Sequence, residues 1–313
     1  MTAPATAEAI RDVNTRYHDG AAAGYDAKWG IDFGLTGQSQ VLGKLRKALG
    51  RGGLPVFDRG LEIGAGTGYF TLNLMLAGVL REAVCTDISP GMLAALQANA
   101  DELGLEVETI AGDAERLALP DECFDLVFGH AVLHHLPDLE RAFAEFHRVL
   151  RPGGTLVFAG EPSRYGDRLA TVPKRSALTL APLWRRALRA GPATPEGHGA
   201  PGNGRSEGGD HGMEFFVDVH AFSPADLRRL ALDAGLEDAR VTGEELLASW
   251  FGWANRTLES TADPDDVPWL WRQYAYRGYL LLQQIDRRLL EGRLPPEAFY
   301  NLMLAAHRPA SSI

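Results

Sequence analysis

Cysteine, long apolar runs and excess basic charge are all scarce in this 313-residue sequence. The two cysteines, Cys85 and Cys123, lie far apart in apolar segments, which is typical of reduced, partly buried thiols and not of a disulfide framework or a metal site. The first residues, MTAPATAEAI, lack the charged and apolar regions of a signal peptide, and no apolar run is long enough to span a bilayer. These absences predict a cytoplasmic protein that binds no metal.

The net charge of the chain is acidic. The formal net charge is −10, and no long block of Lys or Arg interrupts it. An acidic chain without a basic face matches phosphate backbones poorly, so we expect no nucleic-acid partner. The composition, 45% hydrophobic and 23% charged, is that of an ordinary globular protein. A chain of this length forms one large domain, or one core domain with sizeable insertions.

Strand-like and helix-like segments alternate from residue 56 to residue 161. The strand-like segments are VFDRGLEI, EAVCTDI, LEVETIAG, FDLVFGHAVL and GTLVFAGEP. Between them lie GYFTLNLMLAG, SPGMLAALQANADELG and PDLERAFAEFHRVLRPGG, which predict helices, the second with Ser89 as its cap and Pro90 in its first turn. Strict alternation predicts an α/β fold with a doubly wound parallel sheet.

The remainder of the chain has a different character. Residues 191–212 are rich in Gly, Pro and polar residues and predict a loop or linker. Residues 244–295 predict helices that contain many Trp and Tyr residues, either as the core of a helical cap or as the wall of an apolar pocket. The segment FSPADLRRLALDAGLEDARVTG predicts a capped helix and a strand, and EAFYNLMLAAHRP predicts a final strand. PLWRRALRA, residues 182–190, is a basic helical patch, for which the ordinary interpretation is a solvated face and the alternative is steering of an anionic or lipid-like substrate.

The stretch LEIGAGTGYF places three glycines, Gly64, Gly66 and Gly68, directly after the first predicted strand. Parallel sheets bind ligands at the carboxyl ends of their strands, where the strand order reverses. The spacing is G-x-G-x-G and not the G-x-G-x-x-G of dinucleotide sites. Glu62 stands two residues before the first glycine, where a carboxylate suits a cationic amine better than a pyrophosphate. Both features predict a ligand that carries an ammonium group and no phosphate.

Two further acids complete the description of this ligand. Asp87 ends the second predicted strand, 19 residues after Gly68, a spacing at which a carboxylate can bind both hydroxyls of a ribose. Asp113, in GDAERL after the third strand, can accept a hydrogen bond from an adenine amino group. An amine, a ribose and an adenine without phosphates describe S-adenosylmethionine.

Four segments together resemble the class I S-adenosylmethionine-dependent methyltransferases that act on small molecules. They are LEIGAGTGYF, CTDISPGML, AGDAERLALPDECFDLVFGHAVLHHLPD and HRVLRPGGTLVFAGEP, and they span residues 55–162, about a third of the chain. The resemblance implies a seven-stranded Rossmann-like sheet in which a reversed seventh strand lies beside the sixth, with EDARVTG and FYNLMLAAHRP as those two strands. The helical stretch between them is then an insertion that covers the active site.

The resemblance also divides the chain and assigns cofactor contacts. The division is an N-terminal helical lid (1–50), a cofactor-binding core (51–162), a helix with a Gly/Pro-rich linker (163–219), a core helix and strand (220–243), a helical cap insertion (244–296), and a final strand with a tail (297–313). The expected S-adenosylmethionine contacts are Tyr17, Tyr25, Glu62, Gly64, Ala65, Gly66, Gly68, Asp87, Ile88, Met92, Asp113, Ala114 and His130.

A histidine pair follows the fourth predicted strand. An imidazole beside a carboxylate can act as a general base, and neighbouring strands bring this pair close to Glu161 at the end of the fifth strand. We therefore predict His135 as a base paired with Glu161, and His134 as a further catalytic candidate. The alternative is that the pair only begins a helix packed under the cofactor. His18, His211 and His220 could also reach the site.

The sequence thus predicts methyl transfer to a small apolar or aromatic molecule, with an oxygen acceptor favoured over nitrogen or carbon. It indicates no particular oligomeric state. Two alternatives stay open: a protein that binds S-adenosylmethionine without methylating, and a dinucleotide oxidoreductase, which the glycine spacing and Glu62 disfavour.

Overall fold

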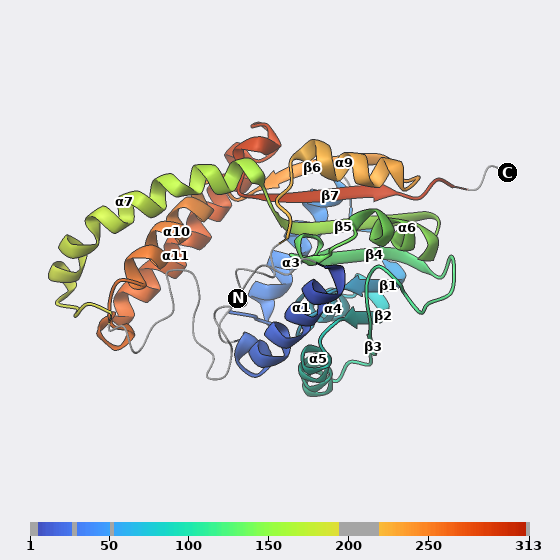
Figure 1. Ribbon diagram of the computed structural model, residues 1–313, viewed down its shortest axis with the longest axis horizontal. Helices are drawn as coiled ribbons and strands as arrows, with labels where there is room; N and C mark the ends of the chain where they lie inside the picture. Colours follow the sequence, from blue (N-terminus) through green and yellow to red (C-terminus); the bar gives the residue numbers. More distant parts are fainter. Residues whose placement is uncertain (1–5, 27–29, 51–52, 194–218, 311–313) are drawn as a thin grey trace. The chain divides into compact units, whose positions relative to one another are not determined.

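The structure is a computed structural model, and its chain divides into two compact units, each described by itself (Figure 1). The sheet unit comprises Met1–Glu161, Gly208–Val241 and Met303–Ile313, and the helical unit comprises Pro162–Glu207 and Thr242–Leu302. The residues that the structure describes are 6–26, 30–50, 53–193 and 219–310. Most of the predicted Gly/Pro-rich linker, with His211, lies outside them.

Seven strands form one sheet in the order β3-β2-β1-β4-β5-β7-β6. Their bounds are β1 Phe57–Ile63, β2 Leu80–Asp87, β3 Glu108–Ala111, β4 Phe124–His130, β5 Leu150–Pro162, β6 Glu237–Glu244 and β7 Asn301–His307. The neighbouring pairs among β1 to β5 are parallel. The β7 strand is antiparallel to β5. The amide of Gly153, near the start of β5, donates to the carbonyl oxygen of Arg308, and the amide of Ser163, just after β5, donates to that of Tyr300. The α/β class, the seven strands and the reversed last strand beside the sixth are confirmed.

Helices cover both faces of the sheet. In the sheet unit these are α1 Ala7–Ala21, α3 Leu35–Leu49, α4 Tyr69–Leu76, α5 Pro90–Leu103, α6 Leu139–Val149 and α9 Pro224–Asp233, with short 3₁₀ turns η1 Ala22–Gly24 and η2 Leu133–His135. Buried residues of α3, α4 and α5 join one core cluster with the strands. On the other face Phe143 and Phe146 of α6 are fully buried and pack with Phe158 of β5, each ring contributing about 2 kcal/mol through burial.

Local sequence signals explain where several helices begin. Ser89 accepts a hydrogen bond from the Met92 amide, and Pro90 occupies the first turn of α5, as predicted. The α9 helix begins with a capping box in which Ser223 and Asp226 each accept from the other's amide. These caps confirm the predicted starts of both helices.

Two predicted boundaries are wrong. The helix expected to be stopped by Pro152 and Gly153 ends earlier, at Val149. The β5 strand begins at Leu150, because Pro152 and Gly153 suit an irregular strand start with a register shift against β4. The last strand was expected from Glu297, but residues Pro296–Ala298 form a 3₁₀ turn and β7 begins at Asn301. Pro295, directly before that turn, and Pro296, its first residue, fix φ and lack the amide donor of a strand ladder.

The helical unit contains α7 Arg164–Leu188, α10 Leu247–Glu259 and α11 Trp269–Ile285, with short turns η3 Pro264–Asp266, η4 Asp286–Leu290 and η5 Pro296–Ala298. Its aromatic residues pack on one another: the ring centroids of Trp184 and Trp271 lie 5.2 Å apart, and those of Phe251 and Tyr274 lie 5.5 Å apart. The predicted aromatic segment is therefore helical, but its aromatic rings are only partly buried, and Trp269, at 67%, and Tyr274, at 54%, are exposed. The expectation that it covers the active site stays a prediction.

None of the helices in the described part of the chain combines the length and the apolar character that crossing a bilayer demands.

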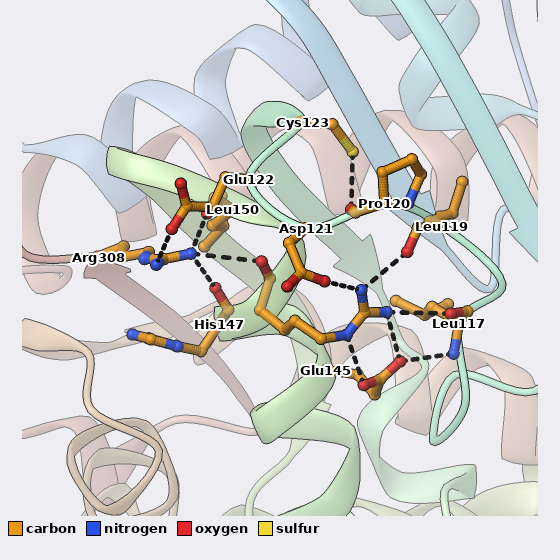
Figure 2. A network of polar contacts seen from close by, with 11 residues as sticks. Leu117, Leu119, Pro120, Asp121, Glu122, Cys123, Glu145, His147, Leu150 and Arg308 are labelled. Carbon is orange, nitrogen blue, oxygen red and sulfur yellow. Dashed lines mark hydrogen bonds and ion pairs between the residues drawn. The ribbon is translucent and has the colours of Figure 1, made fainter.

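Arg308, directly after β7, ties the last strand to the middle of the sheet (Figure 2). One terminal nitrogen lies 3.0 Å from the carbonyl oxygen of His147 and 2.6 Å from that of Leu150, and the other pairs with the carboxylate of Glu122 at 2.5 Å. The side chain is only 16% exposed. Because α6 ends and β5 begins at these carbonyls, Arg308 satisfies acceptors that a helix end leaves open.

Replacing this arginine should therefore destabilise the sheet. We expect Arg308→Ala to lower the free energy of unfolding by about 3 kcal/mol, since it removes charge-assisted hydrogen bonds and leaves buried carbonyls without a donor. Urea denaturation measures the loss. Arg151→Ala is the matched control, because Arg151 forms a more exposed ion pair with Asp125 and should cost less than about 1 kcal/mol. Equal losses in the two variants would contradict this role for Arg308.

Candidate active site

A cavity of about 110 Å³ lies at the carboxyl ends of β1, β2 and β4 in the sheet unit. These three strands meet where the strand order reverses, the usual ligand position in a doubly wound sheet. The predicted residues that line the cavity are Tyr25, Gly64, Gly66, Asp87, Ile88, Met92, Asp113, Ala114, His130 and His135. The predicted residues that do not line it are Tyr17, Glu62, Ala65, Gly68, His134 and Glu161.

The three glycines have different tasks. All adopt positive φ, at 62° for Gly64, 53° for Gly66 and 91° for Gly68. A Cβ on Gly64 would come within 2.4 Å of a methyl of Val132, and one on Gly68 within 2.9 Å of Leu72, so both positions serve close packing. A Cβ on Gly66 would meet no atom within 4 Å, and Gly66 lines the cavity. Of the three glycines, only Gly66 therefore has open space beside its backbone.

Asp87 fixes this turn against the end of β2. One of its oxygens accepts from the Gly66 amide at 2.9 Å, and the other accepts from the Ser89 amide at 2.9 Å. The carboxylate is 8% exposed and lines the cavity. Burial raises the pKa of Asp87 above its ordinary value, while these two amides and the nearby His18 act in the opposite direction.

Glu62 is turned away from the cavity. Its carboxylate accepts from the amide of Thr71 at 3.1 Å and from the hydroxyl of the same residue at 2.5 Å. It is 2% exposed, and burial raises its pKa to about 8. The two donors at the start of α4 explain why the side chain points there. Its predicted contact with an amine stays a prediction, because Glu62 contributes nothing to the lining.

Asp113, which follows β3, forms an ion pair with Arg11 of α1. Asp113 pairs with Arg11 at 2.7 Å and accepts from the Glu115 amide at 3.0 Å, and Arg11 also pairs with the Glu115 carboxylate. Arg11, Asn14 and His18 all line the cavity. Their spacing of three and four residues puts them on one face of α1, a signal that the sequence contained. Tyr17 directly precedes His18, so its side chain points about 100° away from that of His18 around the helix and does not line the cavity.

The predicted pairing of His135 with Glu161 is wrong. Glu161 is fully buried, and one of its oxygens lies 2.9 Å from Nδ1 of His134. The same carboxylate accepts the amides of Val132 and Leu133, both at 3.0 Å, and of His134 at 3.2 Å. It therefore anchors the turn η2, and the residue whose side chain turns toward Glu161 is His134.

His135 lines the cavity instead. Its ring centroid lies 3.9 Å from that of His134 and 5.5 Å from that of His18, the latter edge-on. His130 lines the cavity too and stacks on Phe70 at 4.9 Å. His220 does not line it: its Nε2 lies 3.0 Å from the carbonyl oxygen of Leu136. The described histidines that face the cavity are therefore His18, His130 and His135.

Comparison with known proteins adds an independent observation. A family model described as "Methyltransferase domain" matches residues 61–158. A malonyl-[acyl-carrier protein] O-methyltransferase of Methylococcus capsulatus is 39% identical over 142 residues, which are 44% of this chain and 48% of that protein. A demethylmenaquinone methyltransferase of Mycolicibacterium paratuberculosis is 35% identical over 189 residues, 58% of this chain and 74% of that protein. The chain thus spans about half the length of the first relative and more of the second.

Solved structures share the fold. A phosphoethanolamine N-methyltransferase 2 of Haemonchus contortus, in complex with phosphomonomethylethanolamine and S-adenosylhomocysteine, superposes with a TM-score of 0.56 at 18% identity, over 96% of this chain and 60% of that one. The [4+2]-cyclase SpnF superposes with a TM-score of 0.57 at 16% identity, over 99% and 100%. At these identities the likeness concerns architecture alone.

The glycine turn yields a paired prediction. Gly66→Ala and Gly64→Ala both place a side chain at positive φ, which costs about 1–2 kcal/mol. Gly64→Ala adds an overlap with buried Val132 and should destabilise the protein more. Gly66→Ala fills the cavity instead, and should weaken S-adenosylhomocysteine binding at least about tenfold. Chemical denaturation and titration calorimetry measure the two effects, and unchanged binding by Gly66→Ala would count against ligand contact there.

The buried carboxyl of Glu62 predicts a pH effect on stability. Because its pKa of about 8 in the folded protein exceeds the ordinary 4.5, the folded state keeps a proton that the unfolded chain releases. The stabilisation is complete below pH 4.5 and is lost as the pH rises toward 8, at up to about 1.4 kcal/mol per pH unit.

Glu62→Gln removes this titration, and its amide oxygen can accept both bonds from Thr71. We expect the variant to lose less stability than the parent between pH 5 and pH 8.5, as measured by urea unfolding at each pH. Parallel stability curves for the two proteins would rule out a titrating Glu62.

Proposed function

The chain belongs to the S-adenosylmethionine-dependent methyltransferases, and we propose that it transfers a methyl group to a small molecule. The observation that carries this proposal is the cavity in which the bare backbone of Gly66 and the carboxylate of Asp87 stand together at the ends of β1 and β2. We further propose an apolar or aromatic acceptor with a reacting oxygen, and a cytoplasmic location.

The cavity suits S-adenosylmethionine by its chemistry. Its lining contains the carboxylates of Asp87 and Asp113, and its one arginine, Arg11, is paired with Asp113. Such a lining favours a phosphate-free, cationic nucleoside over a dinucleotide. Asp87 would hold the ribose hydroxyls, Asp113 the adenine amino group and Gly66 the open backbone. When bound, the cofactor supplies an electrophilic methyl group.

The protein's own residues supply proton transfer and positioning. We assign His135 as the base that takes the proton from an acceptor hydroxyl, because its ring lines the cavity beside that of His18. Glu161 and His134 act as positioning residues, since the buried carboxylate holds three amides of the turn that presents His135. The apolar side chains of Val132 and Leu136, also in the lining, help to exclude water.

The names of the two relatives give different substrates and so indicate no single acceptor for this chain. The alternative is a protein that binds S-adenosylmethionine without transferring its methyl group. An assay for S-adenosylhomocysteine release against a panel of phenols, quinols, carboxylic acids and amines distinguishes a methyltransferase from a non-methylating binder. Release with a hydroxyl or carboxyl acceptor supports the proposal, and tight cofactor binding without release from any acceptor favours the alternative.

Replacing the proposed base gives a sharper test once an acceptor is found. His135→Ala should lower kcat by about 10²–10⁴-fold and leave S-adenosylhomocysteine affinity within a few-fold, because proton transfer is lost and the cofactor contacts remain. His147→Ala is the matched control, since His147 lies on α6 and does not line the cavity. Stopped assays measure kcat and calorimetry measures S-adenosylhomocysteine affinity for both variants. Equal kcat values for His135→Ala and the parent would remove His135 as the base.

A further inference from the structure

The α7 helix of the helical unit has a face that no described element of its unit covers. Its packed face carries Ala170, Ala177 and Ala181, all buried, and α10 packs against α7. Away from these alanines stand large apolar side chains that are exposed: Val172 is 55% exposed and Leu183 is 68% exposed. Exposed apolar residues on one helix are unusual enough to mark an interaction surface.

These side chains form a row along one side of the helix, interrupted midway by the exposed Ser176. The apolar row consists of Tyr165, Leu169, Val172, Leu180 and Leu183. Its members recur at intervals of three, four and eight residues, which at 3.6 residues per turn places them on one side of the helix. The row extends over most of the helix, whose 25 residues span about 37 Å.

A second row, of arginines, runs beside the first. Arg164, Arg168, Arg175 and Arg186 recur at intervals of four, seven and eleven residues, and two of them directly precede members of the apolar row. Arg168, Arg175 and Arg186 are exposed. The α7 sequence contains six basic residues and one acidic residue, whereas the whole chain carries a net charge of −10. Positive charge is thus concentrated along one edge of the exposed apolar row.

We propose that this face of α7 docks on an anionic lipid membrane, with the apolar row at the level of the acyl chains and the arginines at the headgroups. A helix with an apolar face, a basic edge and few acids binds in the plane of such an interface, and anionic headgroups complement its charge. The two prolines of α7, Pro173 and Pro182, suit a surface helix, where water or headgroups satisfy the carbonyls that they release. The proposal goes beyond methyl transfer and is tested without it.

The experiment is sedimentation of the full-length protein with lipid vesicles. We expect binding to vesicles of equal parts phosphatidylcholine and phosphatidylglycerol at 0.1 M NaCl, much weaker binding at 0.5 M NaCl, and little binding to phosphatidylcholine alone. Equal binding to both vesicle types, or none to either, would overturn the proposal.

Paired variants locate the surface. Arg168→Ala with Arg175→Ala should lower the partition coefficient roughly 25-fold, about fivefold for each charge. The matched control is Arg228→Ala with Arg229→Ala on α9, which removes the same charge from exposed positions of the sheet unit and should leave binding within about twofold. If the two double variants bind vesicles alike, α7 is not the docking face.

The apolar row has its own control on the same helix. Leu180→Ser with Leu183→Ser should reduce binding at least about tenfold, whereas Leu178→Ser, an exposed leucine outside the row, should not. All substituted side chains are exposed, and circular dichroism checks that each variant is folded. A self-associating protein that binds no vesicles, and that Leu180→Ser with Leu183→Ser renders monomeric in sedimentation velocity, would show that a second copy covers this face and would overturn the lipid proposal.

Discussion

A single buried carboxylate joins the parts of the chain that form the cavity. Asp87 ends β2 and accepts the amides of Gly66, from the turn after β1, and of Ser89, at the start of α5. Because the carboxylate is almost inaccessible to water, its removal would leave two amides without their partner and release the turn. The open backbone at Gly66 therefore depends on Asp87 even without a ligand, and the ribose contact that we propose falls on the same residue.

A second buried carboxylate, that of Glu161, also holds the backbone of a turn beside the cavity. Glu161 gathers the amides after β4 and thereby fixes Val132, whose methyl group occupies the space that a side chain at position 64 would need. The turn that presents His135 and the glycine turn are thus packed together. This arrangement supports the positioning role that we propose for Glu161, a residue that does not itself line the cavity.

The sequence predicted the architecture because alternation, caps and the glycine turn are local signals. The start of α5 at Ser89 and Pro90 is an example, since both residues act within one turn of the helix. The prediction of which adjacent histidine faces Glu161 was wrong. The answer depends on the turn after β4, where Ala131 adopts a φ of 54°, and no sequence pattern predicts that conformation. Arg11 was missed for another reason: its helical phase is visible, but its partner Asp113 is distant in sequence.

A methyl transfer of the proposed kind joins two reactants with opposite solubility. S-adenosylmethionine is charged and dissolved in water, and the polar lining around Asp87 and Asp113 suits it. An apolar acceptor partitions into lipid, so its concentration in water is low and its encounter with a dissolved enzyme is slow. A protein held at a bilayer by the basic edge and apolar row of α7 would meet such an acceptor in the phase where it accumulates. With six basic residues and one acidic residue, α7 is a basic helix in an otherwise acidic chain, which would permit its attachment to anionic lipid while the acidic remainder is repelled from it.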